Sequence, residues 1–310
     1  ITCRRDCPES QPKAPRDRRQ TYGVHPTSAC LPTTHRPARF HTAPCSFASI
    51  VLPAFVRSDA AIDFPALHRV TKLVTRNADI VIDITTYPTE HARKSATQAR
   101  AVGVGILGFA DVLHQLGHPF DSPPARLLNK LVFETVYHAA LEASTELADE
   151  YGCYPNWRGS PAHSGTLRYD VWKTQPTDMY NFPALKARIS MFGLRNSTLT
   201  ARTSAPGCLF GCCGSAEPYC SNISSLDIHG SKVSLVTRSL VRQLQILGSV
   251  QEISTIPQHI REIYRTASEL PHCVLLNLET ERGPYIDQSS SKPMIVLSTQ
   301  RAVYATTAVQ

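Results

Sequence analysis

The stretch from Arg100 to Gly152 constrains the fold most, because a glycine-rich segment is followed there by the longest amphipathic helical pattern in the chain. Ser122 is a typical N-cap, Pro123 fits the first helical position, and Gly152 is a typical helix stop. Between them, apolar residues recur at helical spacing along one face. We expect the other face to be solvated or to lie against a polar neighbour, since it carries Lys130, Glu134, Glu142, Glu146 and Glu150.

The glycines that open this stretch have the spacing of a dinucleotide-binding fingerprint, with Gly103, Gly105 and Gly108 as G-x-G-x-x-G. That fingerprint follows a buried strand and precedes an acidic residue by roughly 20 residues. Residues 91–100 are instead polar and charged, HARKSATQAR. We therefore interpret the glycines as a turn that allows tight backbone packing and leads into a short helix over 109–116.

The chain divides by composition near residue 45. Residues 1–44 are rich in proline and arginine and nearly lack periodic apolar residues, so we predict loop or disorder. Residues 45–310 are predicted to form one domain of mixed helices and strands, an α/β fold. We expect strands over 196–201 and 294–297, a strand or buried loop over 46–56, and helices over 63–84, 183–192, 233–247 and 256–278. In the first of these helices the predicted apolar face is Leu67, Val70, Leu73, Val74, Val81 and Ile84.

Composition excludes few classes of function. The chain has 310 residues, 42% hydrophobic and 18% charged, with a net charge of +7. Much of the positive excess lies in residues 1–44 and not along a helix or stripe, so we expect no direct contact with nucleic acid. No run of 18 apolar residues occurs, which predicts no membrane span. There is no signal-peptide pattern and no initial Met, so we expect a fragment or a gene with an ill-defined start.

The cysteines and histidines give no strong metal pattern. Four of the ten cysteines cluster as Cys208, Cys212, Cys213 and Cys220. Two adjacent cysteines are poorly placed to bind the same metal ion, so free thiols are expected. A small zinc-stabilised interaction module remains an alternative there. We interpret the histidines as isolated, and predict surface or satisfied histidines, no metal site and no cofactor. They are His68, His114, His118, His138 and His163.

A series of collinear blocks carries a family resemblance. It begins with RAVGVGILGFAD and LLNKLVFETVYHAALEAS and continues through the blocks at 159–161, 169–172, 176–178, 193–197, 217–219, 281–283 and 286–289. Together these blocks, over about residues 45–290, resemble the large, catalytic chain of class I ribonucleotide reductase. The resemblance implies part of a ten-stranded α/β barrel, with the C-terminal half or so present.

The resemblance also implies which residues an active member needs. In the family a thiyl radical forms on the cysteine of an Asn-x-Cys-x-Glu pattern, the glutamate acts as general base, and a second cysteine about fifteen residues later supplies electrons. Cys45 falls at the position of that second cysteine, and Cys30 lies fifteen residues earlier. Ser28 then stands at the asparagine position and Pro32 at the glutamate position. Proline cannot accept a proton, although the match at Cys30 could equally be a coincidence.

Two further family elements are altered. In active members a Pro-Thr-Ala-Ser-Thr-Ala segment holds the substrate diphosphate, and the corresponding residues here are Arg202, Thr203, Ser204, Ala205, Pro206 and Gly207. Pro206 lacks a backbone donor, while Arg202 either binds phosphate or simply faces solvent. The family passes its radical through two adjacent tyrosines, but Tyr304 stands beside Val303. After Cys273 the chain has no further cysteine, and the region after Ser291 is shorter than is usual in the family.

The combination resembles the catalytically inactive large-chain homologue of betaherpesviruses. That resemblance implies a protein of the virion tegument and host cytoplasm that acts through viral or host protein partners, without reductase activity. The alternatives are an active reductase large subunit, or a fragment of one, that works with a small radical subunit, and the zinc-stabilised module described above.

Overall fold

The computed structural model describes residues 45–202, 250–267 and 269–288 in full, and the backbone of six short strands outside these ranges. Four of those strands pair as antiparallel hairpins, β1 (Thr33–Arg36) with β2 (Arg39–Thr42) and β5 (Ile223–Ile228) with β6 (Ser231–Val236). The other two, β7 (Met294–Ser298) and β8 (Arg301–Ala305), form a third hairpin, which includes the strand predicted over 294–297.

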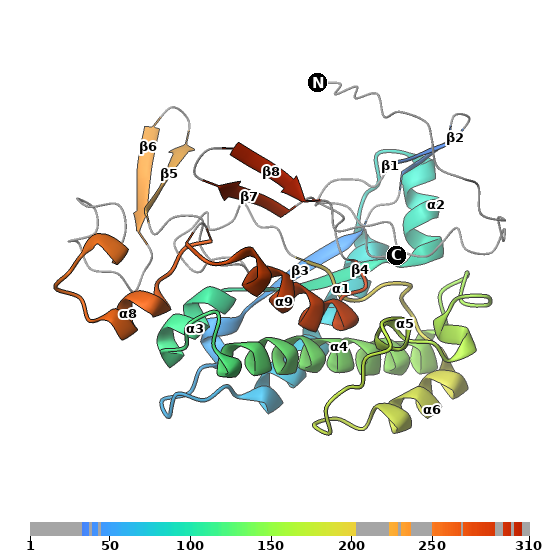
Figure 1. Cartoon of the computed structure of the whole chain (residues 1–310). Coiled ribbons are helices and arrows are strands. Elements are labelled where there is room, and N and C mark those ends of the chain that lie inside the picture. The colour runs from blue at the N-terminus through green and yellow to red at the C-terminus, as the bar shows by residue number, and fades with distance from the viewer. Residues whose placement is uncertain are drawn as a thin grey trace, which may run out of the picture.

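Parallel strands form the centre of the described part (Figure 1). Strand β3 (Ser46–Val51) pairs in parallel with β4 (Val102–Leu107), with Ser46 opposite Val102. Parallel bridges then join Val104 to Thr200, and Ala201 to Gln288. Four chain segments therefore lie side by side in one direction, with helices in the connections between them. This is the arrangement expected for part of an α/β barrel wall, and it confirms the predicted fold class.

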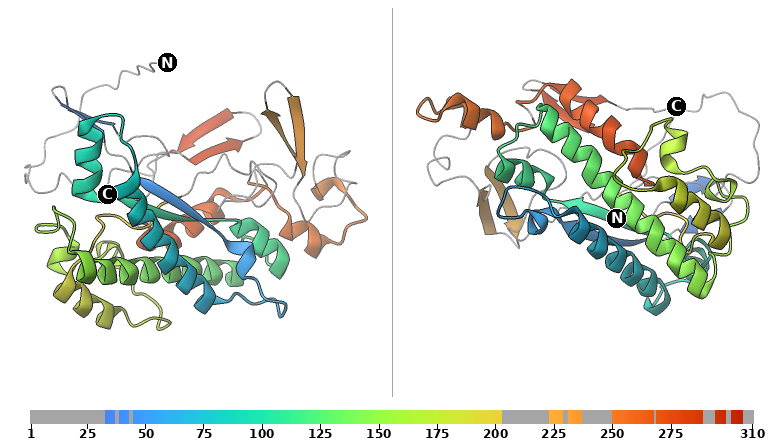
Figure 2. Two further views of the ribbon diagram at one scale, coloured as in Figure 1. Left: turned by 180° about the vertical axis from the view of Figure 1, so that it is seen from behind. Right: turned by 90° about the horizontal axis from the view of Figure 1, so that it is seen from below.

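Helices cover these strands. Helix α1 (Phe64–Ile84) is capped by the Asp63 carboxylate, which accepts from the Ala66 backbone N–H over 2.8 Å. Helix α4 (Pro123–Tyr151) is capped by Ser122, as predicted. In the right view of Figure 2, α4 lies between α1 and α9 (His272–Arg282). The other described helices are α2 (Glu90–Ala99), α3 (Phe109–Leu116), α5 (Arg168–Val171), α6 (Phe182–Phe192) and α8 (Gln258–Ile263), with short 3-10 turns at 52–55, 162–164, 250–252 and 283–285.

The glycine segment is a strand and not the predicted turn. Gly103 and Gly105 lie inside β4, which is buried on both faces, and only Gly108 turns the chain, with φ of 80°. A Cβ on Gly103 would lie 2.7 Å from the Phe47 ring and 2.8 Å from the Ala201 Cβ. The glycines thus permit close packing, as expected, and their place within the strand is incompatible with a dinucleotide-binding turn.

Several predicted helices differ in the structure. The pattern over 256–278 divides into α8 and α9, because Pro271 lacks the N–H that a continuous helix needs. Residues 231–236 form strand β6, where near-helical spacing predicted helix, and α2 was missed because residues 90–99 are mostly polar. The hairpin at 33–42 falls within the segment predicted as loop or disorder. The domain boundary near residue 45 stays a prediction, and residues 1–32 lie outside the described part.

Helix α1 buries a different face from the one predicted. Leu67, Thr71, Thr75, Ala78 and Ile82 are buried, whereas most of the predicted apolar face is exposed, as at Leu73 and Ile84. The Thr71 and Thr75 hydroxyls donate to the carbonyl oxygens of Leu67 and Thr71, over 2.7 and 2.9 Å. Threonine can therefore be buried here because its hydroxyl is satisfied within the helix.

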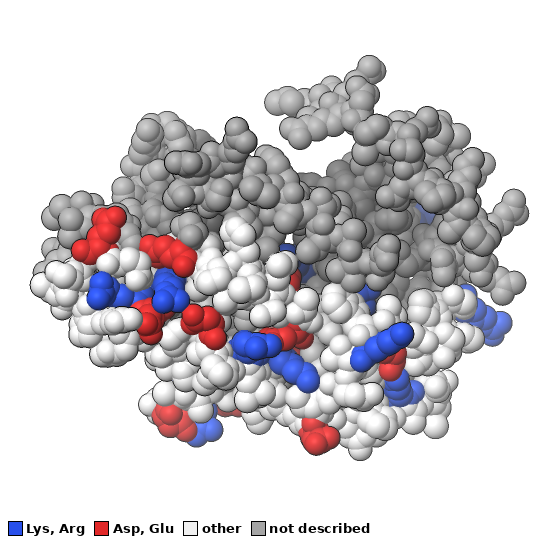
Figure 3. All heavy atoms as spheres, viewed as in Figure 1, with Lys and Arg blue, Asp and Glu red and all other residues white. Residues whose placement is uncertain are grey.

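Charge on the visible face is mixed. Figure 3 shows basic and acidic side chains interspersed over the described part of this face, with no area of one sign. None of the helices among the described residues is long and apolar enough to cross a membrane.

Candidate functional site

Cys45 is the residue directly before β3, the first of the fully described barrel strands. Its Sγ accepts a hydrogen bond from Gln288 Nε2 over 3.1 Å. The same amide donates to Thr198 Oγ1 over 2.7 Å and to the Val102 carbonyl over 3.1 Å. Burial raises the pKa of the Cys45 thiol to about 11, although the Gln288 hydrogen bond opposes the rise. The thiol is therefore protonated and poorly nucleophilic at neutral pH.

Asp287 fixes the segment that carries Gln288. Its Oδ2 accepts from the backbone N–H groups of Leu199 and Thr200, over 2.9 and 3.3 Å. Burial raises the pKa of this carboxyl, against the lowering effect of those two bonds. Thr200 Oγ1 also accepts from the Asp287 N–H over 3.0 Å. These reciprocal bonds hold the last described strand segment beside residues 198–201, and so hold Gln288 against Cys45.

Arg202 follows the bridged segment and is held by an acidic residue. Its backbone N–H donates to the Gln288 carbonyl over 3.3 Å, and its Nη2 lies 3.0 Å from Glu279 Oε1 of α9. The Arg202 side chain is partly exposed and has an acidic counter-ion. Thr203, Ser204, Ala205 and Pro206 of the predicted phosphate loop lie outside the described residues, as does the cluster Cys208–Cys220.

The other predicted relic positions are not placed. Ser28, Cys30 and Pro32 lie outside the described residues, so their relation to Cys45 is untested. Tyr304 lies in β8 opposite Ile295, and its side chain lies outside the described part. Of the predicted catalytic positions, the structure describes the surroundings of Cys45 alone.

Glu134 has a structural role and does not lie on a solvated face. It is completely buried and accepts hydrogen bonds from the Thr177 N–H and hydroxyl and from Tyr285 OH, the last over 3.0 Å. Glu142 and Glu146 of α4 lie against a basic residue of α1, as expected: Lys72 Nζ is 3.1 Å from Glu142 and 2.6 Å from Glu146.

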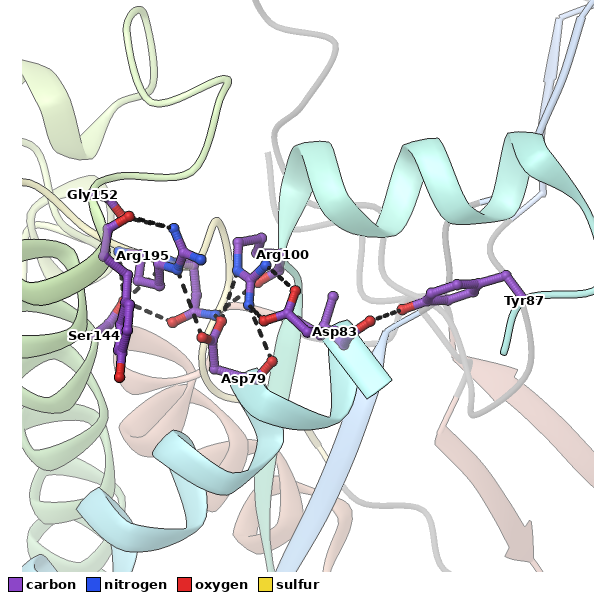
Figure 4. Close-up of polar contacts among 10 residues, drawn as sticks. Asp79, Asp83, Tyr87, Arg100, Ser144, Gly152 and Arg195 are labelled. Atoms are coloured by element: carbon purple, nitrogen blue, oxygen red, sulfur yellow. Dashed lines mark hydrogen bonds and ion pairs between the residues drawn. The ribbon is translucent and has the colours of Figure 1, made fainter. Parts of the chain in front are cut away.

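The sequence did not predict a buried polar network around Arg100. Figure 4 shows the Arg100 guanidinium between two carboxylates of α1. Its Nε donates to Asp79 over 2.9 Å, and Nη1 to Asp83 over 2.7 Å. Asn196 Nδ2 donates to the same Asp79 oxygen over 2.8 Å, and its Oδ1 accepts from Ser144 of α4 over 2.9 Å. The network joins α1, α4 and two loops, so we expect it to stabilise the folded chain.

The prediction of isolated histidines is wrong for one pair. His68 Nε2 of α1 lies 2.9 Å from His138 Nδ1 of α4, and 3.8 Å from Glu142 Oε2. The sequence signal was present as His138-x-x-x-Glu142, which places two potential ligands on one helical face. The partner His68 lies 70 positions away, so only the packing of α1 on α4 reveals the group.

Comparison with known proteins decides the family. Residues 14–309 match the family model described as the barrel domain of ribonucleotide reductase. This chain belongs to the ribonucleotide reductase large-subunit barrel family. The match includes residues 14–44, ahead of the region where the sequence blocks showed the resemblance.

Relatives of the reductase barrel come from several kinds of organism. The chain is 38% identical to the ribonucleoside-diphosphate reductase large chain of Schizosaccharomyces pombe, over 80% of this chain and 32% of that one. It is 37% identical to the large subunit of Danio rerio, over 88% and 37%, and 38% identical to that of Vaccinia virus, over 80% and 34%. The chain thus spans about a third of the length of these curated relatives.

Proposed function

We propose that this barrel is a ribonucleoside-diphosphate reductase large-subunit-like protein that does not reduce ribonucleotides and acts through protein contacts. The observation that carries the proposal is Pro32, which stands two residues after Cys30. If Cys30 matches the radical cysteine of the family, Pro32 occupies the position of the general-base glutamate. Proline has no group that can accept a proton. Loss of a general base costs on the order of 10² to 10⁴ in rate.

The environment of Cys45 supports a protein that keeps the barrel fold but not the radical chemistry. The strand, the buried thiol and the Gln288 amide that contacts it are all in place. A buried thiol held by a neutral amide is a stable part of a barrel wall whether or not a radical forms nearby. Retention of Cys45 is therefore compatible with a fold kept for its surfaces and not for turnover.

The contact made by Arg202 also favours the proposal. An arginine that replaced the hydroxyl and backbone donors of the phosphate loop would need to turn toward the substrate. Here its guanidinium lies 3.0 Å from the Glu279 carboxylate, and binding a diphosphate would require separating this pair and bringing two anionic groups together. We therefore propose weak or no binding of nucleoside diphosphates.

The proposed location is the virion tegument and host cytoplasm, with viral or host proteins as partners. This part rests on the resemblance to betaherpesvirus homologues. Mass spectrometry of purified virions, with fractionation of infected cells, tests it. The protein should be recovered inside protease-treated virions and in the cytoplasmic fraction, and its absence from virions would contradict a tegument role.

Reductase activity is tested by steady-state turnover. The protein as expressed from its own gene is mixed with a competent small radical subunit, a dithiol reductant and a ribonucleoside diphosphate, and the S. pombe large chain serves as the active control. We expect no deoxynucleotide above the background without large chain. Sustained turnover would favour the alternative, an active large subunit that works with a small radical subunit.

A further inference from the structure

Two histidines and a glutamate meet where α1 packs against α4. His68 lies in the second turn of α1, and His138 and Glu142 lie one turn apart in α4. His68 Nε2 is 2.9 Å from His138 Nδ1 and 3.8 Å from Glu142 Oε2, and the three potential ligand atoms all lie within 4.8 Å of one another. This group lies apart from Cys45 and plays no part in the proposed function.

The facing ring nitrogens already have nearly the separation that a shared metal ion needs. At 2.9 Å one nitrogen donates and the other accepts, so a single proton lies between them. A tetrahedral zinc ion, with Zn–N distances of about 2.0–2.1 Å, places two ligand nitrogens about 3.3 Å apart. Exchange of the proton for the ion therefore requires the nitrogens to separate by on the order of 0.4 Å and each ring to turn by roughly 35°, so that both lone pairs point at the ion.

Aromatic packing holds both rings in place. The Tyr180 ring stacks on His68 with centroids 5.2 Å apart and on His138 with centroids 4.6 Å apart. The Phe182 ring meets His138 edge-on, with centroids 5.1 Å apart. Burial lowers the pKa of both histidines, that of His138 to about 4. The packed rings hold the His68 and His138 nitrogens close to each other and to Glu142.

Glu142 supplies the anionic ligand. Lys72 Nζ and Arg188 Nη1 lie 3.1 and 3.3 Å from its carboxylate and would compete with an ion. Lys72 is closer to Glu146, at 2.6 Å, so it keeps a counter-ion when Glu142 turns to the metal. Two imidazoles and one carboxylate, with solvent in the fourth position, form a ligand set known for zinc.

We propose that His68, His138 and Glu142 bind a Zn²⁺ ion that links α1 to α4. An ion that binds the folded chain and not its unfolded form raises the unfolding temperature in proportion to the logarithm of its free concentration. The site joins two helices that are separated by strand β4 in the sequence, so its expected effect is on the packing of these helices and not on chemistry at Cys45.

The test uses the full chain, stripped with chelator and titrated with ZnCl₂ by calorimetry. We expect one ion per chain, a higher unfolding temperature, and affinity weakened at least about tenfold in both His68→Ala and His138→Ala. His163→Ala, which removes an exposed histidine outside the group, is the matched control and should bind as the parent does. Circular dichroism checks that each variant folds, and parental affinity in folded His68→Ala or His138→Ala would overturn the proposal.

Cobalt distinguishes this site from the cysteine cluster at 208–220. Co²⁺ bound by imidazole and carboxylate shows visible d–d bands without the near-ultraviolet charge-transfer band of a thiolate ligand. We expect this spectrum in the parent, and unchanged in a variant with Cys208, Cys212, Cys213 and Cys220 replaced by Ser. A thiolate band, or loss of binding on that replacement, would assign the metal to the cysteines and overturn the proposal.

Lys72→Met gives a readout that a purely structural cluster would not produce. Removal of the ammonium frees the Glu142 carboxylate, so Zn²⁺ should bind more tightly even though two ion pairs are lost. Glu142→Gln should weaken binding at least about tenfold. Unchanged affinity in both variants would contradict Glu142 as the third ligand.

Discussion

Gln288 donates a hydrogen bond from Nε2 to the Cys45 Sγ over 3.1 Å, and so joins the first fully described barrel strand to the last. The same amide reaches the Val102 carbonyl and the Thr198 hydroxyl, which belong to the two segments between them. One side chain thus spans the four parallel segments of the described wall. Cys45 is held as a protonated, largely buried thiol.

Cys45 should react slowly with alkylating agents. Its pKa of about 11 lowers the thiolate fraction at pH 8 by about 100-fold relative to a thiol of pKa 9. Cys273 is exposed and serves as the internal reference. Timed iodoacetamide labelling of the folded chain, read by peptide mass spectrometry, should modify Cys273 long before Cys45. Equal rates at the two positions would show that the thiol is neither buried nor held by Gln288.

Glu134→Ala should destabilise the chain strongly. The substitution leaves the Thr177 N–H, the Thr177 hydroxyl and the Tyr285 hydroxyl without their acceptor in the core. Each buried donor without a partner costs about 1–3 kcal/mol, so we expect a loss of at least about 3 kcal/mol in the free energy of unfolding. Tyr285→Phe removes a single hydroxyl and should cost about 1 kcal/mol. Urea denaturation of both variants measures the difference, and equal losses would contradict the network.

The two carboxylates that hold Arg100 should contribute unequally to the free energy of unfolding. The Asp79 side chain is 5% exposed, whereas that of Asp83 is 53% exposed, although both pair with the same guanidinium. Asp79→Ala leaves Arg100 and Asn196 short of a buried acceptor and should cost about 3 kcal/mol or more. Asp83→Ala should cost less than about 1 kcal/mol, because water replaces an exposed carboxylate. The reverse order in denaturant unfolding would show that Asp79 is not the buried partner.

Acidification should destabilise the chain partly through His114. Burial lowers the pKa of this histidine to about 4, from an ordinary value of 6.5. The unfolded chain therefore binds its proton first, and stability falls as the pH falls from about 6.5 toward 4, by about 3 kcal/mol in total. His114→Phe keeps an aromatic ring near Tyr264 and should flatten this part of the stability–pH curve. An unchanged slope between parent and variant would contradict a buried neutral His114.

Local signals predicted the helices well where their ends are encoded in the sequence. Ser122 and Gly152 cap and stop α4 where their residue types indicated. Asp63 and Gly117 likewise stand at the start of α1 and the end of α3. The strand at 102–107 was mistaken for a turn, because glycine is rare in strands and its reason, the close approach of Phe47 and Ala201, comes from chain segments distant in the sequence. The buried face of α1 was missed because threonines satisfied within the helix replace apolar residues there.

The site was predictable only through the family resemblance. Cys45 was identified by its spacing within the matched region. No local pattern indicates that Gln288, 243 positions away, contacts it. The pairing of His68 with His138 likewise depends on the packing of two helices. Sequence reasoning found positions whose chemistry is local and missed those that are defined by a distant partner.

The central claim is that the barrel framework persists without radical chemistry at its cysteines. Single-turnover reduction tests it most directly: the chain is pre-reduced, mixed with a competent small radical subunit and labelled ribonucleoside diphosphate, and product is counted per chain, which removes any need for re-reduction by a C-terminal tail. We predict product about 100-fold or more below that of the S. pombe large chain treated identically. Product approaching one deoxynucleotide per chain would contradict it.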